Sequence, residues 1–369
     1  MTNSRRGSAF KIFFVPFLLC SVLFSPQARA ENPASPYEIK LQKGWQLQAA
    51  AKISAEGPAI SAPSFSPQGW TGAAVPSTVL GALADSGAYG DILALKSLDA
   101  VSSAPFAGAW WYRTEFTIPK ARWLSSTRLA FDGINYSADI WLNGRKVAGA
   151  SEIKGAFRRF EFDITSFVSK GRNTLAVEVF PPKPGDPSIG FVDWNPAAAD
   201  ASMGLWRGVR VLRSGPVSLH DPYILTRVDT DTLKSADLTV TVEARNETSA
   251  PVAGELAGNI GAIHFSKKVK LAAGETARVT FTPADFPALA LKNPRLWWPH
   301  DLGKPELYTL GLKFTIGDLV SASSSLRFGV RQVSDYLTPE GYRGYRINGK
   351  PVLIRGGGWT DDIFLRQSP

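Results

Sequence analysis

Apolar and polar residues alternate with a period of two through most of this chain, and that alternation restricts what it can fold into. Residues 160–164, 175–179 and 238–242 each form such a stripe, and the longest runs through residues 308–316. The pattern places one side of a strand against a core and the other side in solvent, as in antiparallel sheets. We therefore expect the first 330 residues to be β-structure, apart from one short helix.

Local sequence signals predict two hairpins and that helix. Asn-Gly pairs at 143–144 and 348–349 each separate two strand-like runs, and Asn-Gly favours a two-residue hairpin because both turn residues adopt positive φ. Ser77 is expected to cap the helix, and Gly87 is expected to follow its end.

The first thirty residues have the composition of a secretory signal peptide. Residues 5–11 carry three basic side chains, residues 12–24 form an apolar run, and residues 28–30 read Ala-Arg-Ala, a small–x–small cleavage site. The apolar run is too short for a convincing membrane span. We expect cleavage after Ala30, export to the periplasm or the extracellular medium, and no membrane anchor.

Charge and cysteine usage exclude several classes of function. The only cysteine, Cys20, lies in the leader, so the mature chain is expected to have no disulfide and to depend on its core for stability. Without the four basic residues of the leader, the formal net charge falls from +9 to +5. This modest charge forms no basic run with interleaved aromatic residues, which argues against nucleic acid as a partner. His220, His264 and His300 have no metal-ligand spacing, so we expect no metal and no cofactor.

The mature chain divides into three segments. Residues 31–216 are rich in tryptophan, and residues 217–333 contain regularly spaced short strands whose number and length suit an immunoglobulin-like sandwich. Residues 334–369 begin a different architecture. Their apolar run at 352–354 does not alternate, as expected for a strand buried on both faces.

Seven stretches together carry a resemblance to a known family. The chain resembles the N-terminal part of glycoside hydrolase family 2, the β-galactosidase/β-mannosidase superfamily, and within it the exo-β-D-glucosaminidases and their mannosidase-like relatives. The stretches are AWWYRTEF (109–116), FDGINYSADIWLNGRKV (131–147), DWNP (193–196), MGLWRGVRV (203–211), RLWWP (295–299), FGVRQV (328–333) and NGKPVLIRGGGW (348–359).

The resemblance implies a mainly β chain with a jelly-roll sugar-binding domain and an immunoglobulin-like β-sandwich, followed by the first strand of a truncated (β/α)8 barrel. Residues 355–359 (RGGGW) resemble the end and following loop of that strand, on the face where such barrels place active sites. Residues 360–365 (TDDIFL) would begin the first barrel helix. Retaining hydrolysis needs two carboxylates ~5 Å apart. In this family both come from later barrel strands, so no catalytic residue is assigned here.

Asp193, Trp194 and Asn195 are the first candidates for sugar binding. A carboxylate accepts hydrogen bonds from neighbouring hydroxyls or an ammonium, an amide both donates and accepts, and an indole stacks on a pyranose ring. In related mannosidases a loop of this kind reaches from the jelly roll into the sugar site. The alternative is a loop whose tryptophan fills a gap between sheets.

Trp359, Asp361 and Asp362 are the second group of candidates. Trp359 follows three glycines, and either forms the floor of the terminal sugar subsite or packs into a core. The two aspartates either hydrogen-bond sugar hydroxyls or cap the helix expected to follow them.

Two hypotheses for function remain. In the first, the chain is the N-terminal portion of an exo-acting β-glycosidase, inactive by itself, whose substrate is β-1,4-linked glucosamine of the chitosan type, with β-mannosides as the alternative. In the second, it is a non-catalytic carbohydrate-binding protein. The sequence leaves the oligomeric state open.

Overall fold

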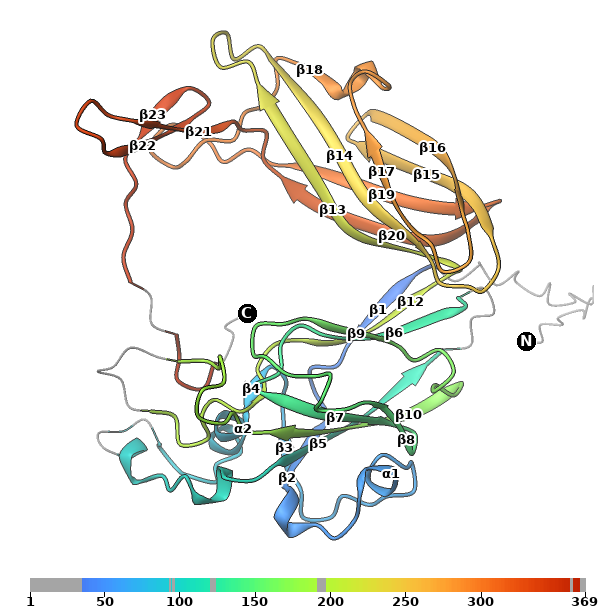
Figure 1. The fold of residues 1–369 in the computed structure, drawn as a ribbon, viewed down its shortest axis with the longest axis vertical. Coiled ribbons are helices and arrows are strands. Elements are labelled where there is room, and N and C mark those ends of the chain that lie inside the picture. Colours follow the sequence, from blue (N-terminus) through green and yellow to red (C-terminus); the bar gives the residue numbers. More distant parts are fainter. Residues whose placement is uncertain are drawn as a thin grey trace, which may run out of the picture. The chain divides into compact units, whose positions relative to one another are not determined.

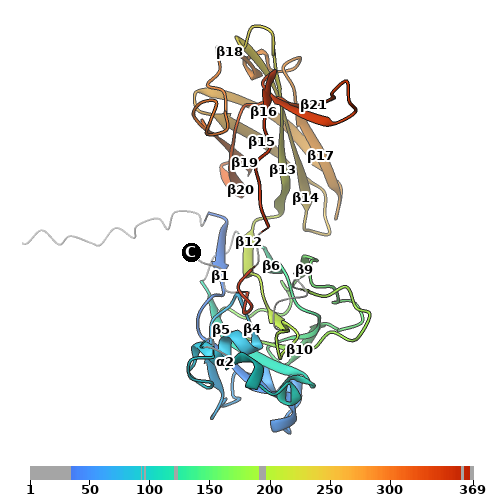
Figure 2. The same ribbon diagram turned by 90° about the vertical axis from the view of Figure 1, so that its left-hand side faces the viewer.

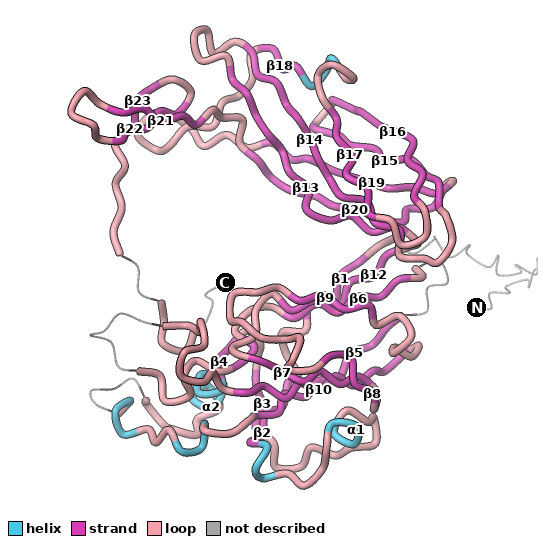
Figure 3. The backbone as a smooth tube through the Cα atoms, in the orientation of Figure 1, coloured by secondary structure: helices cyan, strands magenta, loops and turns pink. Residues whose placement is uncertain are grey.

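The computed structural model describes residues 35–92, 94, 97–119, 124–190, 197–358 and 361–365. Within these residues the chain consists mainly of antiparallel strands with a few short helices (Figures 1 and 3). None of the described helices is long and apolar enough to cross a bilayer. The mainly β fold expected from the alternation is therefore confirmed.

Two antiparallel sheets form the first sandwich. The six-stranded sheet has the order β3 (Thr71–Ala73), β2 (Trp45–Ala49), β5 (Trp110–Ile118), β10 (Gly171–Phe180), β7 (Ser137–Leu142) and β8 (Arg145–Ala148). The four-stranded sheet has the order β1 (Tyr37–Lys40), β12 (Val209–Ser214), β6 (Ser126–Phe131) and β9 (Phe160–Asp163).

One apolar core lies between these two sheets. It contains Leu129 and Phe131 from β6, Ile140 from β7 and Val177 from β10, each with no exposed surface. The predicted stripe at 175–179 thus faces the core.

The six-stranded sheet is also covered on its outer face, which the sequence did not predict. Trp111 of β5 and Ala176 of β10 pack there against Ile60 of the short helix α1 (Gly57–Ile60). Arg113 Nε donates to the Ile60 carbonyl oxygen at 3.1 Å, so the buried guanidinium fixes α1 to the sheet. Because α1 covers the outer face, the middle of these strands is apolar on both faces. The alternation of apolar and polar residues is therefore harder to see in the sequence.

The structure also contains several short elements. A two-stranded sheet pairs β4 (Ser77–Thr78) with β11 (Gly204–Leu205). The other helices are α2 (Val79–Asp85), η1 (Ala50–Lys52), η2 (Leu98–Ala100), η3 (Ala104–Phe106) and η4 (Pro287–Leu289).

The second sandwich is immunoglobulin-like and also has two antiparallel sheets (Figure 2). One contains β13 (Val217–Val228), β14 (Ser235–Asn246) and β17 (Thr276–Phe281), with β18 (Ala290–Lys292) beside β14. The other has the order β16 (Ile263–Leu271), β15 (Val252–Ile260), β19 (Tyr308–Ile316) and β20 (Leu319–Phe328).

Both Asn-Gly hairpins are confirmed. Asn143 and Gly144 have φ of 51° and 83°, and Asn348 and Gly349 have φ of 49° and 78°. The helix α2 is also present, but its cap is Thr78, whose side chain accepts a hydrogen bond from the Gly81 N–H at 3.0 Å. The prediction of Ser77 as the cap was wrong by one residue, because both residues belong to β4 and the helix begins only after Thr78.

A three-stranded sheet of β21 (Val333–Leu337), β22 (Arg343–Ile347) and β23 (Lys350–Val352) follows the second sandwich. The prediction that residues 352–354 form a strand buried on both faces was wrong. The strand ends at Val352, and the side chains of Leu353 and Ile354 are 78% and 66% exposed. Among the described strands β23 pairs only with β22, so nothing in the described chain covers this run, and the described residues contain no barrel.

The expectation of a helix beginning at residues 360–365 is also not met. Residues 361–365 form a turn, in which the Leu365 N–H donates to the Asp362 carbonyl oxygen at 2.7 Å. Phe364 is only 1% exposed and joins the core of the first sandwich.

The core of the second sandwich gives a direct test of the fold. Phe281 has no exposed surface, and its ring centroid lies 4.8 Å from that of Phe265. Phe281→Ala is expected to lower the free energy of unfolding by about 3–5 kcal/mol, because it leaves a cavity. Phe157→Ala, at a side chain that is 68% exposed, is the matched control. Equal urea-unfolding midpoints for the two variants would contradict this core assignment.

Candidate functional site

Four of the six predicted sugar-binding residues, Asp193, Trp194, Asn195 and Trp359, lie outside the described residues. The other two, Asp361 and Asp362, are described. The described part of the candidate site therefore consists of the chain that flanks residues 191–196 and of residues 361–365.

Asn135 joins the chain on both sides of residues 191–196. Its side-chain oxygen accepts a hydrogen bond from Ser188 Oγ at 2.9 Å, and its side-chain nitrogen donates to the carbonyl oxygens of Ala201 and Ser202 at 3.1 and 2.8 Å. Its backbone also exchanges two hydrogen bonds with Gly204, at 2.9 and 2.7 Å. Asn135 has no exposed surface, so these bonds do not compete with water, and the two flanks are held at one point.

Asp200 continues this arrangement from the second flank to the helix α2. Its carboxylate is 1% exposed and accepts hydrogen bonds from the N–H groups of Leu80 and Ser202 at 2.7 and 2.9 Å. Burial raises the pKa of Asp200 to about 6, although the hydrogen bonds from Leu80, Thr78 and Ser202 favour the ionised form. Desolvation therefore outweighs the hydrogen bonds, and the pKa lies above its ordinary value of 3.8.

The N-terminal end of α2 contacts two segments that are distant from it in the sequence. A helix leaves its first N–H groups without partners inside the helix. Here the Thr78 N–H donates to the Phe364 carbonyl oxygen at 3.4 Å and the Val79 N–H to the Met203 carbonyl oxygen at 2.7 Å. With the Leu80–Asp200 bond, these contacts bring residues 200–204 and residues 361–365 to the same end of one helix. Figures 1 and 2 show the red terminal segment beside α2.

The two described candidate aspartates differ in their surroundings. Asp361 is exposed to solvent, whereas Asp362 is half-buried and its carboxylate accepts a hydrogen bond from the Phe364 N–H at 2.9 Å. An aspartate was expected to cap a helix here. Asp362 does accept a backbone hydrogen bond, but it stabilises a turn, while Asp361 presents its carboxylate to the solvent.

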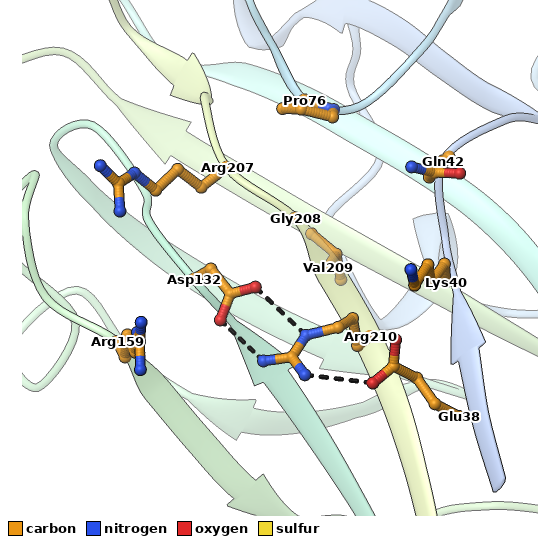
Figure 4. A pocket seen from close by; sticks show the side chains of 10 residues that line it. All are labelled: Glu38, Lys40, Gln42, Pro76, Asp132, Arg159, Arg207, Gly208, Val209 and Arg210. Atoms are coloured by element: carbon orange, nitrogen blue, oxygen red, sulfur yellow. Dashed lines mark hydrogen bonds and ion pairs between the residues drawn. The ribbon is translucent and has the colours of Figure 1, made fainter. Parts of the chain in front are cut away.

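A charged groove on the four-stranded sheet of the first sandwich is a separate feature (Figure 4). Its volume is about 530 Å³. Arg210 forms two hydrogen bonds to Asp132, at 2.7 and 3.1 Å, and one to Glu38 at 3.2 Å. The groove is lined by Glu38, Lys40, Gln42, Pro76, Asp132, Arg159, Arg207, Gly208, Val209 and Arg210. Its four cations outnumber its two carboxylates, so the groove repels a cationic sugar and is a poor site for glucosamine.

The described residues contain no cluster of three or more His, Cys, Asp and Glu side chains that would hold a metal ion. His220 instead lies 2.7 Å from Ser218 Oγ, beside Glu247, whose side chain is 3% exposed. Burial raises the pKa of Glu247, but hydrogen bonds from His220 and Ser218 and the charges of Arg128 and Arg245 outweigh it and hold the pKa at about 2. These contacts give His220 a structural role.

Sequence reasoning missed the residues that hold the flanks. Asn135 and Asp200 are polar, yet they lie in stretches that resemble strand ends and loops, where such residues are common. Phe364 was assigned to a helix of another domain. The one sequence signal for Asp200 was its position between the candidate loop and the small residues before Met203. Only the fold shows that its carboxylate accepts a hydrogen bond at the start of a helix.

The raised pKa of Asp200 predicts a pH dependence. Between its ordinary value of 3.8 and its folded value of about 6, the folded chain holds a proton that the unfolded chain releases, so this group makes stability fall as the pH rises through that range. Asp200→Asn removes the titration. We expect its free energy of unfolding, measured with urea, to fall less from about pH 4 to about pH 6 than that of the wild type.

The exposed Asp231 supplies the control for this experiment. Asp231→Asn is expected to keep the wild-type pH profile. A profile for Asp200→Asn that also matches the wild type would show that Asp200 does not titrate in this range.

Two family profiles match the chain. The profile described as a glycosyl hydrolase 2 galactose-binding domain-like domain matches residues 45–185, and the profile described as glycosyl hydrolases family 2 matches residues 217–331. These ranges fall within the first and the second sandwich.

Individual relatives agree with the profiles. An exo-β-D-glucosaminidase of Streptomyces avermitilis is 41% identical over 324 residues, which are 88% of this chain and 36% of that protein. A mannosylglycoprotein endo-β-mannosidase of Lilium longiflorum is 31% identical over 89% of this chain and 38% of its own length.

A solved structure shows the same likeness in three dimensions. The crystal structure of an Amycolatopsis orientalis exo-chitosanase in complex with PNP-β-D-glucosamine has a TM-score of 0.82 and 37% identity, over 90% of this chain and 38% of that one. This chain thus spans little more than a third of the length of the relatives it matches.

Proposed function

This chain belongs to glycoside hydrolase family 2, and we propose that it forms the N-terminal portion of an exo-acting, retaining β-glycosidase that hydrolyses β-1,4-linked glucosamine of the chitosan type. The observation that carries the proposal is the structural match, at 37% identity, to an exo-chitosanase whose structure holds a β-D-glucosaminide. The 41% identity to an exo-β-D-glucosaminidase supports the same substrate class. In this proposal the first sandwich is the jelly-roll sugar-binding domain, and β23 leads into a (β/α)8 barrel.

The proposed sugar contacts have a common chemical logic. Glucosamine carries an ammonium group at neutral pH, so its terminal subsite calls for carboxylates. Asp193, Asp361 and Asp362 supply them in this proposal, Asn195 hydrogen-bonds hydroxyls, and Trp194 and Trp359 stack on the sugar ring. The flanks held by Asn135 and Asp200 support the proposal, because they bring the chain around residues 191–196 to the helix end that also binds residues 361–365.

A β-mannoside is the second candidate substrate. The observation in its favour is the 31% identity to a plant endo-β-mannosidase over 89% of this chain. The two substrates differ at the C2 position, where a cationic amine in glucosamine replaces a neutral hydroxyl. Discrimination between them therefore depends on carboxylates near that position.

We further propose that residues 1–30 direct export to the periplasm or the extracellular medium, and that the chain acts on oligosaccharides there. N-terminal sequencing of the mature protein would test this, because cleavage after Ala30 predicts Glu31 as the first residue.

Residues 31–369 by themselves are expected to release no reducing sugar from chitosan oligosaccharides. By the family resemblance, both catalytic carboxylates come from later barrel strands. A contaminant-free preparation is incubated with glucosaminides and mannosides, and reducing ends are measured. Hydrolysis of either substrate would show that this part of the chain contains its own catalytic pair, and would contradict the assignment.

A chimera provides the positive test. Residues 31–369 replace the matching part of the Amycolatopsis exo-chitosanase, and hydrolysis of PNP-β-D-glucosamine is expected to be retained. Asp193→Ala in this chimera is expected to lower kcat/KM by about 10- to 100-fold through lost substrate positioning. The exposed Asp231→Ala is the matched control. Unchanged kinetics for Asp193→Ala would remove this residue from the sugar site.

A further inference from the structure

Phe364 packs into the core of a domain that lies far from it in the sequence. Its side chain is 1% exposed and belongs to the same apolar core as Leu80 and Leu83 of α2. Ile363 packs against that core as well, and Leu365 is only 6% exposed. Two consecutive apolar residues, Ile363 and Phe364, thus attach residues 361–365 to the first sandwich.

This packing position of Phe364 depends on the absence of a side chain at Gly81 in α2. A Cβ at Gly81 would lie 2.9 Å from the Phe364 Cβ and 2.7 Å from Ser77 Oγ, which is closer than real Cβ contacts. Gly81 therefore allows the close approach of Phe364 to the helix. The backbone contributes in the same place, because the Thr78 N–H donates to the Phe364 carbonyl oxygen.

The anchored residue is hydrogen-bonded to the aspartate two positions before it. Asp362 accepts hydrogen bonds from the Phe364 N–H through its carboxylate and from the Leu365 N–H through its carbonyl oxygen, at 2.9 and 2.7 Å. Asp361, the residue before it, remains exposed. The described turn is thus hydrogen-bonded at Asp362 and exposed at Asp361.

We propose that Phe364 is a positioning residue, which anchors the turn of residues 361–365 beside Gly81 and so holds Asp361 and Asp362 for contact with an amino sugar. The sugar contact rests on the proposed function, whereas the anchoring does not. The contribution of the first sandwich to the active site is then mechanical: its helix α2 fixes a loop that belongs to the next domain.

The experiment measures amide nitrogen relaxation at Asp361 and Asp362 in the whole mature chain. In the wild type both amides are expected to be as rigid as those of α2. Phe364→Ala is expected to lower their order parameters from about 0.85 to below about 0.6, while the amides of the strands keep theirs. Phe364→Leu, which retains an apolar side chain, is expected to preserve the rigid turn. Leu353→Ala, at an exposed apolar residue of the same tail, is the control.

Gly81→Ala tests the packing of Phe364 against α2 by a change in the helix. In an ordinary helix interior this change is stabilising, but here we expect it to displace Phe364 and to release the turn, as Phe364→Ala does. A Gly81→Ala variant with a raised melting temperature and a rigid turn would overturn the anchoring. So would rigid amides at Asp361 and Asp362 in Phe364→Ala.

Titration with the β-1,4-linked disaccharide of glucosamine then separates the two parts. In the wild type we expect the amide resonances of Asp361 and Asp362 to shift with added sugar. The apparent affinity is expected to fall at least threefold in Phe364→Ala and to return in Phe364→Leu. If the wild-type turn is rigid but no shift occurs with sugar, the sugar contact is overturned together with this part of the proposed function. If sugar binds equally well to Phe364→Ala, only the positioning role is overturned.

Discussion

The N–H groups at the start of α2 have no partner inside the helix, and the candidate site region is arranged around them. A helix cannot satisfy these donors itself, and here their buried position denies them water. The Met203 carbonyl, the Asp200 carboxylate and the Phe364 carbonyl each accept from one of them. Because these acceptors come from widely separated parts of the sequence, one short helix determines where the flank of residues 191–196 and the turn of residues 361–365 meet.

Much of the fold was predictable from local patterns, because the period of two and the Asn-Gly pairs are local consequences of backbone geometry. The failures arose where a distant segment changed the surroundings of a residue. Ala176 lies on the solvent side of its stripe by alternation, yet α1 covers it. Leu353 and Ile354 look like a buried strand, yet no described strand pairs beyond β23. No window of sequence contains the partner that decides such cases.

The candidate site shows the same division between local and distant information. The chemistry of Asp193, Trp194, Asn195 and Trp359 follows from residue type and family resemblance, and their contacts stay predictions. The buried Asn135 and Asp200 have ordinary loop sequences, and their role appears only when both flanks of one loop are followed to a common point. The charged groove beside Arg210 shows the converse, since its conspicuous side chains suit no cationic sugar.

The uncovered run at Leu353 and Ile354 has a practical consequence for anyone who handles this chain. Together with Leu337 and Tyr342, whose relative exposures are 65% and 73%, it leaves four large apolar residues exposed in and around the sheet of β21 to β23, and exposed apolar surface promotes contact between molecules. Salts such as sulfate strengthen apolar association. We therefore expect salting out with sulfate to promote association of this chain, and low-salt buffers to keep it dispersed.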